Sequence, residues 1–206
     1  MHRELRVGCA LFNDGWFHAA HDAWEEHWLS LPAGTIEEQF LHGLIQYTAA
    51  VYHSTRANDK GARGLASSSQ GYFEEVPPIY ERITLYPVIQ YLKAMQCDPT
   101  VVTRKTVPQL RIDGHAVTLS DLKGAEIFLA AQILAVEMDL DAEPIEAGIE
   151  LSKHNATREP FTTLLTAFVQ NDESRDLIYT RLAQHVSQEE ARQADVRDLF
   201  SDDHSS

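Results

Sequence analysis

The sequence has 206 residues and a hydrophobic fraction of 44%, which suits one globular domain with a sizeable core. Its 31 acidic residues outnumber 17 basic ones, and the net charge of −14 argues against nucleic acid or an anionic membrane as a partner, because phosphates attract clustered Lys and Arg. An excess of acid with few lysines is also typical of proteins adapted to high salt, where screening removes the repulsion between like charges.

The N-terminal third shows helical periodicity with clear boundary signals. We predict a short helix over 3–12, followed by a turn at Asn13-Asp14-Gly15. A first long helix follows this turn and ends near Pro32. Thr35 then begins a second long helix, with Glu38 three residues later as its capping-box partner.

The pattern changes after a third helix, which we place over 59–76, with Asn58 as its cap, and which Pro77-Pro78 ends. Residues 79–96 are expected to form one or two short helices, interrupted near Pro87. Two short apolar runs around an Asp-Gly pair then predict a β-hairpin over 108–119. A lone hairpin is marginal, so it should lie against the helical body or a partner chain.

The C-terminal part returns to helix. The predicted helices cover 120–138, 142–154, 160–169, 175–186 and 189–200. We interpret Arg175 as one of several surface ion pairs with neighbouring acids. Residues 201–206 are expected to be disordered. We treat 1–206 as a single domain, with a helical core over 11–97 and a helical extension with the hairpin over 98–200.

Targeting and redox signals point to the cytoplasm. The sequence contains no apolar signal segment and no run of 18 apolar residues that could span a membrane. Cys9 and Cys97 have no CxxC partner and do not make a disulfide framework. We therefore expect reduced thiols and a cytoplasmic protein.

A polar site is indicated on the first long helix. At about 100° per residue, one face carries Phe17, Ala20, His21, Trp24 and Trp28. Glu25 lies at the edge of this face, one turn after His21. A histidine within an apolar stripe needs a polar partner if it is to be buried.

The second long helix offers the partners. Gln46 and His53 lie on one of its faces, in a line that also contains His42. The two helices are joined by a short connection and should pack antiparallel, which would bring these side chains toward the first helix. The candidate cluster is therefore His21, Glu25, Gln46 and His53, with support from Trp24, Trp28, Asn58 and His18.

Three roles fit this cluster. His21, Glu25 and His53 could bind Zn, Fe or Mn, although neither HExxH nor a repeated ExxH is present. The His–carboxylate pair could act as a general base without metal, although no Ser or Cys nucleophile stands at an elbow motif. A hydrogen-bonded core network, in which His21 pairs with Glu25 and Gln46, would need neither ligand nor reaction.

The motifs of these two helices are similar to those of the domain of unknown function 309 family. The residues that carry the resemblance are Phe12-Asn13-x-Gly15-x-Phe17-x-x-Ala20-His21-Asp22-x-x-Glu25-x-x-Trp28, Phe40-Leu41-x-Gly43-Leu44-Ile45-Gln46, Ala50-x-x-His53 and Asn58-x-x-Gly61-Ala62. Asp22 stands where the family usually has glutamate, and Ala57 where it usually has glycine. The resemblance, over about 11–75, implies an all-α bundle of small soluble prokaryotic proteins and no established activity.

Together these observations predict an all-α helical bundle with a C-terminal helical extension and one small hairpin. The leading functional hypothesis is an uncharacterised protein whose polar cluster is structural or binds a small ligand. One alternative is a metal-dependent hydrolase with His21, Glu25 and His53 as ligands and a bound water as nucleophile. Another is a protein-interaction module that acts through the C-terminal helices, for which a homodimer is one form.

Overall fold

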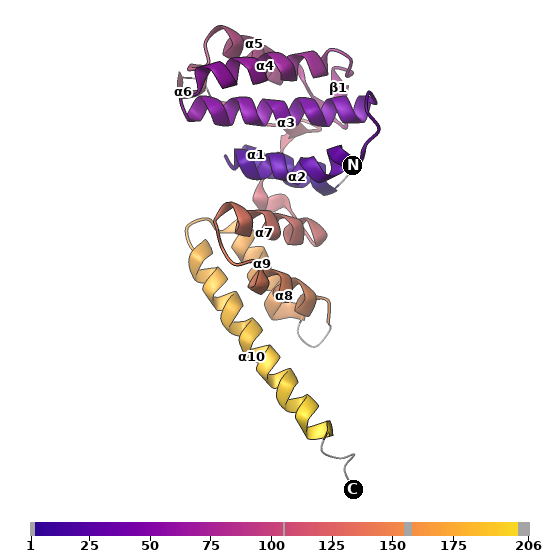
Figure 1. Cartoon of the computed structure of the whole chain (residues 1–206), viewed down its shortest axis with the longest axis vertical. Coiled ribbons are helices and arrows are strands. Elements are labelled where there is room, and N and C mark those ends of the chain that lie inside the picture. Colours follow the sequence, from indigo (N-terminus) through magenta and orange to yellow (C-terminus); the bar gives the residue numbers. More distant parts are fainter. Residues whose placement is uncertain (1–2, 105, 155–157, 202–206) are drawn as a thin grey trace. The chain divides into compact units, whose positions relative to one another are not determined.

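The computed structural model describes residues 3–104, 106–154 and 158–201 (Figure 1). The chain folds into two compact units, 1–133 and 134–206. Each unit has buried apolar side chains of its own. Whether 1–206 behaves as the single domain we expected stays a prediction. The predicted disordered tail lies outside the described residues from 202 onward.

The first unit is built mainly of helices connected by short turns. Its helices are α1 (Arg3–Asn13), α2 (Phe17–Ser30), α3 (Ile36–Thr55), α4 (Asp59–Phe73), α5 (Tyr86–Cys97), the short α6 (Val101–Arg104) and the 3₁₀ turn η1 (Leu119–Asp121). Helix α3 packs against α2 on one side and α4 on the other, α1 packs against α2, and α5 packs against α4 (Figure 1). The all-α fold that the sequence predicts is confirmed.

The second long helix begins where its cap predicts. Thr35 is the N-cap of α3, and its hydroxyl accepts the backbone N–H of Glu38 (3.2 Å). The reciprocal half of the capping box differs, because the Glu38 carboxylate accepts the N–H of Gly34 (3.3 Å). The cap therefore extends one residue back into the connection between α2 and α3.

Helix α3 ends in a Schellman motif. The N–H of Asn58 donates to the carbonyl of His53 (2.9 Å), and the N–H of Ala57 donates to the carbonyl of Ser54 (3.1 Å). Ala57 has a φ of 56°, in the left-handed region that favours glycine. Asn58 then caps α4 by accepting the N–H of Gly61 (3.0 Å), as predicted.

Four two-residue strands form an antiparallel sheet in the order β1-β2-β3-β4. They are β1 (Ile79–Tyr80), β2 (Ile83–Thr84), β3 (Arg111–Ile112) and β4 (His115–Ala116). In register, Tyr80 pairs with Ile83, Ile83 with Ile112, and Ile112 with His115. The β3–β4 hairpin is the one that the Asp113-Gly114 pair predicts.

The β1–β2 hairpin corrects our expectation of helix over 79–96. Its turn residues Glu81 and Arg82 have φ values of 46° and 68°, as a type I′ turn requires, although neither is a usual residue there. The Arg82 guanidinium pairs with the Asp113 carboxylate at the turn of the second hairpin. Helix begins only at Tyr86, and Pro87 lies in its first turn, where a missing N–H costs nothing, instead of interrupting it.

Asn13, the last residue of α1, joins the sheet to the helices. Its side-chain amide donates to the carbonyls of Leu110 and Val117 (both 2.8 Å) and accepts the N–H of Leu110 (2.7 Å). These two residues flank the β3–β4 hairpin. The expectation that the hairpin lies against the helical body is confirmed.

The second unit contains the remaining helices. They are α8 (Glu143–Ser152), α9 (Arg158–Gln170) and α10 (Arg175–Ser201), while α7 (Ala125–Glu137) contains the boundary between the units. Residues 175–201 form one continuous helix where we predicted two. Arg175 pairs with the exposed Asp172 carboxylate (2.5 Å), so the ion pair that we expected is present. Its guanidinium is not on the surface, however, because Arg175 is only 2% exposed and also donates to the carbonyls of Phe168 and Val169 at the end of α9. Among the described residues, no helix combines the length and apolarity that crossing a membrane requires.

Candidate functional site

Trp24 fixes how α2 lies in the core. It is fully buried, and its indole N–H donates to the carbonyl of Leu5 in α1 (3.4 Å). Gly8 lies so close to this ring that an added Cβ would stand 2.0 Å from Trp24 Nε1. Trp24 is therefore a core residue, and its burial leaves His21 and Glu25, on neighbouring parts of the helix, half-buried at the edge.

His21, Asp22 and Glu25 form a compact group on α2. One ligand atom from each lies within 4.8 Å of those of the other two. The Nδ1–H of His21 donates to Asp22 Oδ1 (3.0 Å), because an ionised carboxylate can only accept. The side chains of His21 and Asp22 are 30% and 35% exposed, so solvent reaches both.

Asp22 also controls the charge of His21. Its hydrogen bond is the largest influence and raises the pKa of His21, burial lowers that pKa, and the negative charges of Glu25 and Asp22 raise it further. The net result is a raised pKa. The carboxylates of Asp22 and Glu25 thus attract positive charge, and at low pH the protonated His21 ring supplies it.

His53 lies apart from this group. Asn58 Nδ2 donates to His53 Nδ1 (2.8 Å), and the direction is fixed because Asn58 Oδ1 already accepts the N–H of Gly61. A neutral His53 therefore carries its proton on Nε2, and neither nitrogen presents a free lone pair. His53 is not among the residues whose ligand atoms gather around His21.

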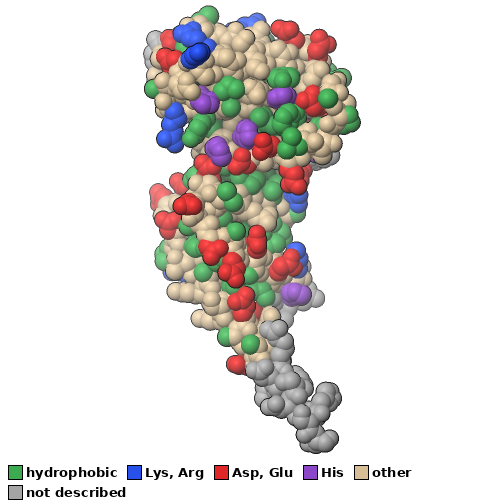
Figure 2. Space-filling model, viewed as in Figure 1, with side chains coloured by type: hydrophobic (Ala, Val, Ile, Leu, Met, Phe, Trp, Pro, Cys, Tyr) green, Lys and Arg blue, Asp and Glu red, His purple; other side chains and the backbone are tan. Residues whose placement is uncertain are grey.

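Aromatic rings connect the two regions. The exposed His18 ring stacks on His21 (6.2 Å between centroids) and contacts Tyr52 (6.0 Å), which contacts His53 (6.1 Å). His18 Nδ1 also lies 3.6 Å from Asp22 Oδ2. Figure 2 shows histidine side chains gathered near acidic ones on one face of the first unit. Gln46 is half-buried on α3 and makes no side-chain hydrogen bond within the described ranges.

Trp28 belongs to a second polar cluster, which joins the end of α2 to the start of α3. Its indole N–H donates to Glu38 Oε1 (2.9 Å), which also lies 3.2 Å from His42 Nδ1. The His42 ring contacts the rings of Trp28 (4.4 Å) and Tyr72 (3.8 Å). Burial raises the pKa of the Glu38 carboxyl, but hydrogen bonds from Trp28, Gly34 and His42 outweigh it and lower that pKa.

The chain's relation to known proteins concerns the segment that contains both clusters. Residues 5–65 match the model of the family described as "Domain of unknown function (DUF309)". This segment is therefore similar to that family, over less than half of the chain. No curated protein matches the chain. The DUF309 segment comprises α1, α2, α3 and the start of α4, and the family's description assigns it no activity, so function has to be argued from the site.

The structure brings together only part of the predicted cluster. His21 and Glu25 are neighbours, as their spacing on one helix implies. The hydrogen-bond partner of His21 is Asp22, where we expected Glu25 and Gln46, and the ligand group contains Asp22 where we expected His53. Adjacent residues normally point to different sides of a helix, which is why the pattern gave Asp22 no role. The resemblance to the family implied glutamate at this position, and we gave the difference no role in the cluster.

Proposed function

We propose that the DUF309 segment is a helical binding module that takes a divalent cation at His21, Asp22 and Glu25. The observation that carries this proposal is the convergence of three ligand atoms within 4.8 Å on side chains that solvent reaches. Ligand atoms of one bound ion lie about 3–3.5 Å apart, so modest rotations of these side chains would close the site.

The charges of the group favour a cation. Two carboxylates stand beside one imidazole, and they raise its pKa by attracting a proton. Above that pKa His21 loses its proton, and a bound metal ion would then balance the negative charges of the two carboxylates. A nitrogen with two carboxylates suits Zn, Mn or Fe, and three protein ligands leave positions for water. A cation bound there would supply Lewis acidity toward a coordinated water or substrate oxygen, the chemistry that a hydrolase would use.

Two other hypotheses have less support. A sealed core network should exclude solvent, whereas His21 and Asp22 are both about one-third exposed. An interaction module needs a contiguous apolar patch. The large exposed hydrophobic residues of α10, among its described side chains, are Leu177 and Val196, about 28 Å apart along a helix at 1.5 Å per residue.

The experiment is metal analysis of the full chain, purified without affinity tag or chelator, followed by calorimetric titration with Zn²⁺ and Mn²⁺. We expect one site per chain and a loss of affinity of at least about tenfold in His21→Ala and Glu25→Gln. Affinity should rise as the pH increases toward the raised pKa of His21 and level off above it, because protons compete with the metal for the same group.

Matched variants make the result specific. Glu26→Gln removes an exposed carboxylate next to Glu25 on the same helix and should leave affinity unchanged. His53→Ala should also retain the metal, whereas the alternative with His53 as a ligand requires its loss. The absence of binding in the parent protein, or equal affinity in the parent and Glu25→Gln, would refute the proposal.

A further inference from the structure

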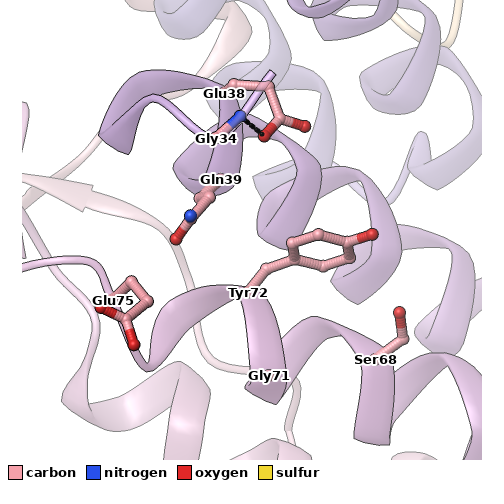
Figure 3. A pocket seen from close by; sticks show the side chains of 7 residues that line it. All are labelled: Gly34, Glu38, Gln39, Ser68, Gly71, Tyr72 and Glu75. Atoms are coloured by element: carbon pink, nitrogen blue, oxygen red, sulfur yellow. Dashed lines mark hydrogen bonds between the residues drawn. The ribbon is translucent and has the colours of Figure 1, made fainter.

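A pocket opens between the start of α3 and the end of α4, away from the His21 group. Its volume is about 440 Å³, within the range of small-molecule sites. Glu38 and Gln39 line it from α3, and Gly71, Tyr72 and Glu75 line it from α4 and the residues after it (Figure 3). The residues around this pocket do not belong to the proposed metal site.

Gln39 brings an unsatisfied acceptor to the pocket. Its side-chain oxygen Oε1 is buried and has no hydrogen-bond partner among the described residues. A buried acceptor without a partner costs free energy that a donor would recover. In Figure 3 the amide end of Gln39 is directed toward the side of the pocket where Glu75 lies. A ligand with an N–H group between these two side chains would satisfy the oxygen once the Gln39 amide turns toward the pocket, because Oε1 exposes less than 1 Å² in this conformation.

The charges around the pocket select a cation. The exposed carboxylate of Glu75 and the carboxylate of Glu38 both line it, and no Lys or Arg does among the described residues. Glu38 is already engaged by Trp28, Gly34 and His42, so Glu75 is the carboxylate available to a ligand. The pocket borders both the C-terminal end of α4, whose partial negative charge favours cations, and the N-terminal end of α3, whose partial charge is opposite, so the carboxylates decide the preference.

Tyr72 supplies a surface for the rest of a ligand. Its ring lies in the lining and stacks on His42 at 3.8 Å with an interplanar angle of 23°. Stacking holds the ring in place, and an aromatic ring attracts both alkyl groups and ammonium ions. A bare metal ion is less suited, because Glu75 belongs to none of the groups of His, Cys, Asp and Glu side chains that could hold one in the described part of the chain.

We infer that this pocket binds a small organic cation with N–H donors, of the primary alkylammonium class. The ammonium group donates to Gln39 Oε1 and pairs with Glu75, and the alkyl part contacts Tyr72. This site is independent of the proposed metal site, so each can fail without the other.

The test is calorimetric titration of the full chain with n-butylammonium chloride. The comparison ligands are 1-butanol, which lacks the charge, tetramethylammonium, which lacks N–H groups, and butyrate, which reverses the charge. We expect saturable binding of butylammonium and at least about tenfold weaker binding of the other three. Gln39→Leu and Glu75→Gln should each weaken butylammonium binding by about tenfold.

Two glycines of α4 provide a matched pair. A Cβ at Gly71 or at Gly64 would meet no atom within 4 Å, so a side chain at either position leaves the core intact, but only Gly71 lines the pocket. Gly71→Leu should abolish butylammonium binding and Gly64→Leu should leave it unchanged, with circular dichroism confirming that both fold. No saturable binding to the parent, preference for butyrate or butanol, or full binding by Gly71→Leu would each overturn the inference.

Discussion

At the scale of single residues, Asp22 determines the protonation of His21. Replacing Asp22 with Asn removes the negative charge but keeps a side chain of similar size. Burial lowers the pKa of His21, and in this variant mainly the charge of Glu25 would still raise it. We therefore expect the pKa of His21 to fall from its raised value. The measurement is an NMR titration of the His21 ring in the parent and in Asp22→Asn. An unchanged His21 pKa would contradict the assigned hydrogen bond, and Glu26→Gln is the control for a change of charge on α2.

The sign of the linked stability follows from the same shift. The folded-state pKa of His21 lies above the ordinary histidine value of 6.5, so protonation stabilises the fold. This contribution is fully present below pH 6.5 and is lost as the pH rises through the raised pKa. Asp22→Asn should reduce that loss. Urea denaturation of both proteins on either side of this pH range measures it directly.

Ala57 carries a backbone conformation that suits another residue. Its φ of 56° costs an alanine roughly 1–2 kcal/mol relative to glycine. Replacing Ala57 with glycine removes this cost, but part of the stabilisation is offset because glycine is more flexible in the unfolded chain. We expect Ala57→Gly to raise the free energy of unfolding by about 0.5–1 kcal/mol. Ala94→Gly, inside α5, is the control and should lower it by about as much. A loss of stability in Ala57→Gly would contradict the left-handed turn.

At the scale of elements, Asn13 joins a helix to a hairpin. Asn13→Ala removes three hydrogen bonds and leaves the carbonyls of Leu110 and Val117 without these donors. We expect the free energy of unfolding to fall by about 2–4 kcal/mol, at roughly 1 kcal/mol per bond plus the cost of the unpaired groups. Chemical denaturation measures it. Asp14→Ala, at the exposed neighbouring position, should change stability far less, and an equal effect of both would show that Asn13 has no special role.

Elements with strong local signals were predictable from the sequence. The Thr35 and Asn58 caps, the Asp113-Gly114 turn and the helical periodicity of α1–α4 depend on residues close together in the chain. The β1–β2 hairpin was missed because Glu81 and Arg82 are not usual residues of a type I′ turn, and the long-range pairing of Arg82 with Asp113 helps to hold them there. Local propensity carries no information about such a contact.

The sequence predicted which helix carries the candidate site but not which side chains complete it, because the latter depends on contacts that local patterns do not encode. The spacing of His21 and Glu25 places them on neighbouring positions of α2. Which side chain His21 bonds depends on rotamers, and how α2 lies in the core depends on the packing of Trp24 against Gly8 of α1. The pocket beside Gln39 likewise requires the end of α4 to lie near the start of α3, a contact between residues more than 30 positions apart in the sequence.

At the scale of the whole molecule, the net charge of −14 should make stability depend on salt. Like charges held together by folding repel one another, and salt screens this repulsion, with a Debye length of about 10 Å at 0.1 M and about 3 Å at 1 M. We therefore expect the free energy of unfolding to rise between millimolar and molar KCl. Equal stability at both concentrations would remove the inference of adaptation to high salt.

A charge variant separates screening from general effects of salt on hydrophobic burial. Glu173 and Glu190 are exposed, so Glu173→Gln/Glu190→Gln changes the net charge from −14 to −12 without touching the core. If repulsion dominates, this variant is more stable than the parent in millimolar KCl, and the difference shrinks in molar KCl. If salt acts mainly by strengthening hydrophobic burial, the two proteins respond in parallel. A constant difference between them across the salt series would therefore assign the response to burial.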